Sequence, residues 1–195
     1  MNVHPMHPFL ARAATAAAGV AAAVPADRPL DAPTPCTDFD TRALINHWVL
    51  YTSHGLEHRA RRTELPKELV DRDFAAEPGW SADYAAQLER AVAAWADPAA
   101  WEGDVDLGGS PVPAVGIARM LVLELLLHGW DVARATGGEI AVDEELAVLV
   151  AEIVAENAEL YRQYEGFAGA VALPDDAPAW HRALAASGRD PHWKG

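Results

Sequence analysis

The stretch Met120-Leu121-Val122-Leu123-Glu124-Leu125-Leu126-Leu127-His128 decides the fold class of this chain. It is apolar on nearly every face of a helix, and a helix of that kind is buried all round by other elements. The chain around it is half hydrophobic, with many alanines and leucines and few runs of β-branched residues. Because that balance favours helices over strands, the sequence predicts an all-α protein.

Prolines and capping residues divide the rest of the chain into helices. Pro8 suits the first turn of a helix and Pro25 ends it, while Gly137-Gly138 offers the left-handed geometry in which helices stop. We expect helices over about residues 8–24, 40–62, 81–96, 110–137, 143–164 and 178–187, and a short β-hairpin within 101–112. This pattern predicts an elaborated four-helix bundle with an additional helix and a short C-terminal helix, as a single domain spanning residues 1–195.

Charge and cysteine usage restrict the class of partner and the compartment. A formal net charge of -14 would repel phosphate backbones and anionic lipid, so we expect no nucleic-acid and no membrane binding. The lone Cys36 allows no disulfide framework and suits a reducing, cytoplasmic location. The segment Ala13 to Ala26 imitates a signal peptide, but the first eight residues lack Lys and Arg and Arg12 comes just before it, so we interpret it as a packed amphipathic helix.

Glu124 and His128 are the informative polar residues of the central helix. An ionised carboxylate among leucines requires a cation, a donor or its own proton. His128 follows Glu124 by four residues, which places the two side chains on one face a turn apart, at a spacing that suits metal ligands. Because a Glu-x-x-x-His pair is also common by chance, its weight comes from the apolar setting.

His47 is the best partner from elsewhere in the chain, since it lies within the apolar run Leu44 to Leu50. A lone histidine in such a place is more often a hydrogen-bonded core residue than a ligand. Together with Glu124 and His128, however, it completes a His/Glu/His set that leaves one coordination position open, as catalytic zinc sites do. We therefore predict a divalent-metal site at these three residues.

Asp131 and Arg134 are candidate supporting residues on the same helix. Asp131 falls nearly on the face of Glu124, where it would be a fourth metal ligand or, in the interpretation that we favour, an acceptor that orients an imidazole N–H. Arg134 would help to orient ligands or substrate. The alternative for Asp131 is an ordinary ion pair with Arg134 or Arg119.

Other candidate groups are weaker. His54 and His58 are four residues apart and form a rival metal pair, but their polar surroundings favour a solvated face. Cys36 lies just before a helix N-terminus, which lowers a thiol pKa, yet a packing role is the preferred interpretation.

Two longer motifs resemble a known family. Pro33-Thr34-Pro35-Cys36-Thr37-Asp38-Phe39-Asp40 with the following Arg42 to His47, and Glu124 to Gly137, are similar to the two signatures of actinobacterial DinB-like proteins related to mycothiol-dependent maleylpyruvate isomerase. The resemblance implies a four-helix bundle whose metal, zinc or nickel, is bound by His47, Glu124 and His128. It also implies mycothiol or a similar low-molecular-weight thiol as cofactor.

Three hypotheses of function follow. The first is a metal- and thiol-dependent transferase or isomerase whose partners are the small-molecule thiol and an electrophilic substrate. The second is a non-catalytic module that binds metal or a small ligand with the same three residues. The third is a structural bundle without metal, and a homodimer is compatible with all three.

Overall fold

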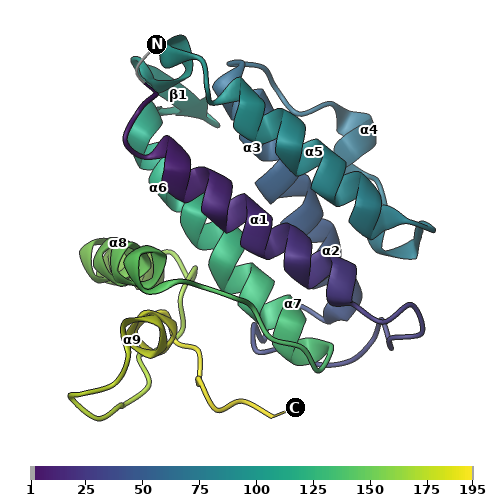
Figure 1. Cartoon of the computed structure of the whole chain (residues 1–195), viewed down its shortest axis with the longest axis vertical. Coiled ribbons are helices and arrows are strands. Elements are labelled where there is room, and N and C mark those ends of the chain that lie inside the picture. Colours follow the sequence, from purple (N-terminus) through teal and green to yellow (C-terminus); the bar gives the residue numbers. More distant parts are fainter. Residues whose placement is uncertain (1–2, 195) are drawn as a thin grey trace.

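The computed structural model describes residues 3–194, which form a mostly helical structure with one small sheet. The longer helices of the first 135 residues lie side by side along the molecule, whereas the two C-terminal helices are seen nearly end-on (Figure 1). The helices are α1 (His7–Ala23), α2 (Thr41–Val49), α3 (Gly55–Ala60), α4 (Lys67–Val70), α5 (Trp80–Ala94), α6 (Ala114–Leu123), α7 (Gly129–Ala135), α8 (Glu144–Gln163) and α9 (Ala179–Ala186). Short 3-10 turns are formed by Phe74–Ala76 and Pro98–Trp101.

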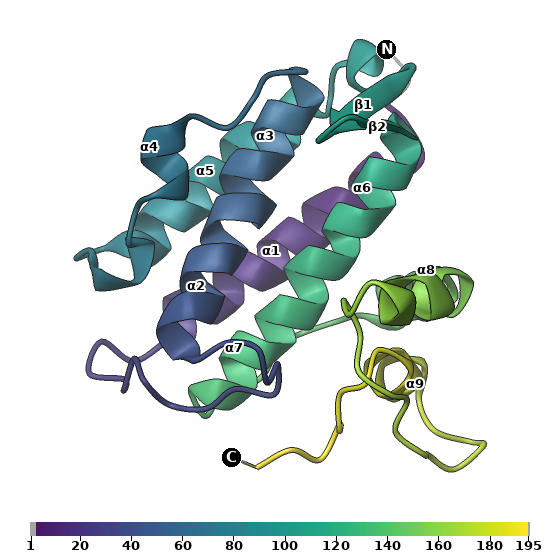
Figure 2. The same ribbon diagram turned by 180° about the vertical axis from the view of Figure 1, so that it is seen from behind.

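Two long helices of the structure each contain a π-helical turn. The turn Leu50–His54 joins α2 to α3, and the turn Glu124–His128 joins α6 to α7. In both places the backbone stays helical on either side of the turn, so α2–α3 and α6–α7 each form one continuous rod (Figure 2). The expected helix over 40–62 is therefore confirmed, with a wider turn inside it.

Helix α1 packs between α5 and the α6–α7 rod. It contacts α5, α6, the π-turn after α6 and α7, as Figure 1 shows. Its buried face consists of Leu10 and small residues such as Ala13 and Ala17. Small side chains let helix axes approach closely, so the alanine-rich segment forms part of the core, as the sequence predicts.

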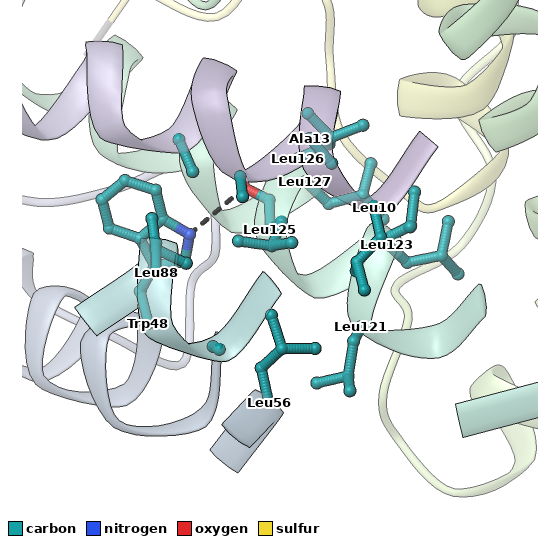
Figure 3. Close-up of a cluster of buried hydrophobic side chains, with 14 of the residues drawn as sticks. Leu10, Ala13, Trp48, Leu56, Leu88, Leu121, Leu123, Leu125, Leu126 and Leu127 are labelled. Atoms are coloured by element: carbon teal, nitrogen blue, oxygen red, sulfur yellow. Dashed lines mark hydrogen bonds between the residues drawn. The ribbon is translucent and has the colours of Figure 1, made fainter. Parts of the chain in front are cut away.

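The core continues through leucines of the central helix, as Figure 3 shows. Leu121, Leu125 and Leu126 are at most 1% exposed. Trp48, on α2, is fully buried beside them and donates its indole N–H to the carbonyl oxygen of Leu125 at 3.2 Å (Figure 3). This bond ties the two rods together at the level of the π-turn after α6.

The predicted hairpin is confirmed, and the helix that follows it begins four residues later than expected, at Ala114 instead of residue 110. Strands β1 (Asp104–Leu107) and β2 (Ser110–Pro113) pair antiparallel, with Asp104 opposite Pro113 and Leu107 opposite Ser110. The expectation that Ser110-Pro111 begins a helix is therefore wrong, because those residues lie in β2 and α6 begins at Ala114. Proline lacks the N–H of a ladder hydrogen bond, and in this two-stranded sheet every strand is an edge strand, where proline is tolerated.

Helix ends elsewhere follow the local chemistry of the sequence. The side chains of Asp40 and Asp143 accept hydrogen bonds from the backbone N–H groups of Ala43 and Leu146 at 2.8 and 3.0 Å. Gly137 adopts φ +77° after α7, the left-handed conformation expected there.

The C-terminal helices lie on the side of α6 opposite α2 and α3 (Figure 2). Helix α8 packs against α9 and α6. Among the described residues, none of the helices combines the length and the apolar composition that a membrane span requires.

Candidate metal centre

His47, Glu124 and His128 converge from the two long rods. His47 lies on the last turns of α2, and Glu124 and His128 are the first and last residues of the π-turn after α6. One ligand-type atom from each of the three residues lies within 4.8 Å of the other two. The predicted residues are thus brought together, although His47 is 77 residues from Glu124 in the sequence.

The distances between these atoms fit a shared cation. The Oε2 atom of Glu124 lies 3.4 Å from Nε2 of His47 and 3.6 Å from Nε2 of His128. Nitrogen and oxygen ligands at about 2.0–2.2 Å from a tetrahedral zinc ion lie about 3.4 Å from one another. The same separations are long for direct N–H···O hydrogen bonds. The donor set and its spacing therefore suit a divalent ion.

The hydrogen bond on the far side of His128 strengthens this interpretation. Its Nδ1 atom lies 3.0 Å from Oδ2 of Asp131, and a carboxylate can only accept, so Nδ1 donates. In a neutral imidazole Nε2 then carries a lone pair, and it faces the Glu124 carboxylate. Two electron-rich atoms at that distance require a cation or a proton between them.

Glu124 is held in its ionised form by its neighbours. Burial raises the pKa of its carboxyl, but the hydrogen bond with His47 and the charges of His128, His47 and Arg189 lower the pKa below its ordinary value overall. The Glu124 side chain keeps 32% exposure, whereas that of His128 keeps 12%. The Glu124 carboxylate is therefore ionised and reachable from solvent.

Asp131 is fully buried and paired with an arginine that the sequence reasoning missed. Arg189, 7% exposed, donates from Nε to both Asp131 oxygens at 2.9 and 3.1 Å and from Nη2 to Oδ2 at 2.7 Å. Burial raises the pKa of Asp131, but Arg189 and the hydrogen bond from His128 lower it overall. One sequence signal for such a partner was the need of a buried carboxylate for a cation.

The partners considered for Asp131 from the sequence are engaged elsewhere. Arg134 donates from Nη2 to the backbone carbonyl of Trp193 at 2.7 Å. Arg119 forms an ion pair with Glu156 across α6 and α8. Arg134 therefore fastens the C-terminal segment, and its side chain contacts that segment instead of the three ligand-type residues.

Cys36 lies beside the same centre. Its sulfur, with His128 and Asp131, forms a second group of three ligand-type atoms within 4.8 Å. Burial, together with the charge of Asp131, raises the pKa of the thiol to about 11 despite Arg189. Both Asp131 oxygens are already bound by Arg189, so this second group suits a metal less well than the first.

Aromatic side chains and a small cavity surround the three residues. The ring of Phe39 lies 5.0 Å, and that of Tyr51 4.8 Å, from the ring of His47. A cavity of about 90 Å³ is lined by Glu124 and His128 and also by Tyr161 and Phe167. The space next to the centre is therefore shaped partly by the C-terminal part of the chain.

The rival pair His54 and His58 does not converge with further ligands. His54 stacks on Phe74 with ring centroids 5.5 Å apart, and His58 contacts the hydroxyl of Thr63 at 2.8 Å. Within residues 3–194 neither histidine belongs to a group of three ligand-type side chains. His54 is thus packed on an aromatic ring instead of facing solvent freely.

The sequence of the chain is similar to one protein family and to two curated proteins. The sequence model of one family, described as mycothiol maleylpyruvate isomerase N-terminal domain, matches residues 10–133. Two curated proteins of Mycobacterium tuberculosis, uncharacterized protein Rv0738 of strain ATCC 25618 / H37Rv and uncharacterized protein MT0763 of strain CDC 1551 / Oshkosh, are each 31% identical over 190 residues. Each alignment covers 94% of this chain and 98% of the relative. No solved structure matches the chain.

Proposed function

The chain belongs to the mycothiol maleylpyruvate isomerase N-terminal domain family, and on that basis we propose that it is a divalent-metal-dependent enzyme. It uses mycothiol or a similar low-molecular-weight thiol, and it acts in the cytoplasm as a thiol S-transferase or isomerase on a small electrophile. We further propose that α1, α2–α3, α5 and α6–α7 are the four helices of a DinB-like bundle. In this proposal α8, α9 and the C-terminal tail belong to the same domain, over residues 1–195.

The convergence of His47, Glu124 and His128 carries this proposal. These residues hold zinc, with nickel as the alternative, and leave one coordination position free. A divalent cation there lowers the pKa of a bound thiol, so that the nucleophilic thiolate is available near neutral pH. The raised pKa of the Cys36 thiol leaves the chain's own cysteine protonated, so an external thiol is the better nucleophile.

Asp131 is the orienting residue of the proposed site. By accepting the Nδ1 proton of His128 at 3.0 Å it fixes the tautomer in which Nε2 faces the ion. Arg189 holds that carboxylate in place. Arg134, which also lies on this helix, acts on substrate only indirectly, through the tail that it fastens.

Elemental analysis of the purified protein tests the proposed metal site. We expect about one zinc or nickel ion per chain, lost on His128→Ala because one of three ligands is removed. His58→Ala, which alters a histidine outside the group, is the matched control and keeps the metal. A folded wild-type protein without metal, even after incubation with zinc or nickel, would sink the proposal in favour of a structural bundle.

Turnover distinguishes the enzyme from a non-catalytic module with the same three ligands. Mycothiol is incubated with an electrophilic test substrate such as 1-chloro-2,4-dinitrobenzene, and the loss of free thiol is followed over time. The enzyme consumes thiol in a reaction that His47→Ala abolishes. Stoichiometric metal binding with thiol loss no faster than in buffer would identify the module.

A further inference from the structure

Arg59, on α3, carries a charge that no group in the described part of the chain neutralises directly. Its Nε atom is buried and has no hydrogen-bond partner. No carboxylate among residues 3–194 lies within ion-pair distance of its guanidinium, in contrast to Arg61 two residues later, which pairs with Glu57 at 2.9 Å. A half-buried cation without a partner is costly unless an anion visits it.

The position of this guanidinium is built into the helix. His47, Tyr51, Gly55 and Arg59 follow one another at intervals of four residues, so they form one row along the α2–α3 rod. The Arg59 side chain turns back along this row toward His47, and its Nη1 atom would lie only 2.6 Å from a Cβ atom at Gly55. Glycine at position 55 therefore makes the space that the guanidinium occupies.

Arg59 interacts electrostatically with Glu124 of the candidate metal centre and also lines an open cleft. Burial lowers the pKa of Arg59, while the charges of Glu124 and Tyr51 raise it in part. The cleft, of about 870 Å³, lies between α3, the connection after it and strand β1. Its other arginine, Arg62, is committed to the backbone carbonyls of Arg59, Ala100 and Glu102. The cleft is also lined by the carboxylates of Glu64, Asp104 and Asp106, none of which forms an ion pair with Arg59 in the described part of the chain. Arg59 is thus the arginine of this cleft whose charge remains available to a ligand.

We propose that Arg59 is an anion-binding subsite that receives a carboxylate of the ligand whose other end reaches the metal centre. This inference rests on the proposed function, because a metal ion bound by Glu124 neutralises the Glu124 carboxylate. The charge of Arg59, which that carboxylate otherwise compensates in part, is then free to attract the carboxylate of a ligand. Gly55, which the guanidinium covers, is eight residues from His47, or about 12 Å along the helix. The ligand therefore carries its carboxylate several methylene groups away from its metal-bound atom.

Thiols with and without a carboxylate test the subsite in the cobalt-loaded protein. The probes are 3-mercaptopropionate and 6-mercaptohexanoate, paired with the neutral 3-mercapto-1-propanol and 6-mercapto-1-hexanol. Binding is followed through the near-ultraviolet absorption of the cobalt–thiolate bond. We expect the wild type to bind 6-mercaptohexanoate about tenfold more tightly than 6-mercapto-1-hexanol, with a smaller preference for the short pair.

Matched variants assign that preference to Arg59. Arg59→Gln removes the preference, because it weakens the binding of the thiols that carry a carboxylate and leaves the binding of the neutral thiols unchanged. Arg59→Lys keeps part of the preference. Arg61→Gln, which deletes a neighbouring exposed charge, leaves the preference unchanged. Gly55→Ala keeps the charge but displaces the guanidinium, so it also lowers the preference. Equal affinity of the wild type for the charged and neutral thiols, or a preference that survives Arg59→Gln, would overturn the subsite.

A second measurement separates this inference from the proposed function. In Glu124→Gln, which lacks a metal ligand and also the carboxylate charge that compensates Arg59 in the metal-free protein, the Nε–H resonance of Arg59, assigned with Arg59→Lys, is followed by NMR during titration with hexanoate and with hexanol. A saturable shift with hexanoate alone supports the subsite, and no shift with hexanoate overturns it. If cobalt does not bind, the proposed function fails while this titration still decides the subsite.

Discussion

At the scale of single residues, the direction of each hydrogen bond determines what the candidate metal centre can hold. The Nδ1–H group of His128 donates a hydrogen bond to Asp131, so in the neutral imidazole the other nitrogen faces Glu124 as an acceptor. That arrangement is stable with a cation between the two groups and unfavourable without one. Outside this candidate centre, burial lowers the pKa of another histidine, His54. The lowered pKa can be detected in how the free energy of unfolding depends on pH.

His54 makes folding stability depend on pH below neutrality. Burial, with the charges of Arg72, His58 and Arg90, lowers its pKa from 6.5 to about 4. The unfolded chain therefore binds a proton between pH 6.5 and about 4 that the folded chain does not bind, and stability falls as the pH falls through this window. One such proton corresponds to a slope of at most about 1.4 kcal/mol per pH unit.

Urea unfolding at pH 7.5, 6.5 and 5.5 measures this slope. Because other groups titrate in both proteins, the difference between wild type and His54→Gln isolates the histidine. We expect the wild type to lose more stability on acidification than the variant. Parallel stability curves for the two proteins would contradict the prediction.

At the scale of elements, π-turns occur in both helices that supply the three ligand-type residues of the candidate metal centre. One π-turn begins at Glu124 and ends at His128, and the other follows three residues after His47. A π-turn re-aims the side chains that follow it, and such turns are frequent at functional sites. The carbonyl of Leu125, within one of them, accepts the indole of Trp48 and so fixes the spacing of the two rods.

Gly129 permits the close contact of the two rods immediately after His128. A Cβ atom there would lie 3.0 Å from Cδ1 of Ile140 and 3.3 Å from Cζ2 of Trp48, whose large ring is fully buried. We expect Gly129→Ala to destabilise the protein by about 1–3 kcal/mol through overpacking, even though alanine favours helices. The free energy of unfolding in urea measures the effect.

Gly116, near the start of the same rod, is the control for this substitution. A Cβ atom there meets only Cγ1 of Val112, at 3.5 Å, an ordinary contact. Gly116→Ala should therefore be neutral or stabilising by up to about 1 kcal/mol. Equal effects of alanine at the two positions would show that the contact with Trp48 does not limit the spacing of the rods.

At the scale of the whole molecule, the C-terminal part of the chain completes the centre. The family match ends at residue 133, but Arg189, Tyr161 and Phe167 all lie beyond it. Arg189 reaches Asp131 across 58 residues of sequence. The segment after α7 therefore supports the predicted ligand His128 and borders the cavity beside it.

Arg189→Lys and Arg134→Lys separate orientation of the ligand from anchoring of the tail. Both variants keep a positive charge. In the wild type Arg134 binds the backbone carbonyl of Trp193, and Arg189 binds the carboxylate of Asp131. Lysine cannot reproduce the bidentate fork on Asp131. We expect Arg189→Lys to weaken metal affinity about 10-fold or more, in the range typical of residues that orient a ligand.

Competition with a chelator of known zinc affinity measures that loss. Arg134→Lys should loosen the tail, which limited proteolysis detects, while leaving metal affinity within about twofold of the wild type. If both variants lose metal affinity to the same extent, Arg189 acts only as an anchor of the tail.

The sequence by itself determined the helical class, most helix ends and the choice of His47, Glu124 and His128 as candidates. It did so because hydrophobic periodicity, capping side chains and the cost of a buried carboxylate are local properties. It placed the start of α6 too early, since proline at 111 suits both a helix start and an edge strand, and only pairing with β1 decides between them. Only the tertiary structure decided that Arg189 meets Asp131 and that, within residues 3–194, Nε of Arg59 is left without a hydrogen-bond partner. Contacts between residues far apart in the chain depend on how the packed helices are arranged, which no local pattern encodes.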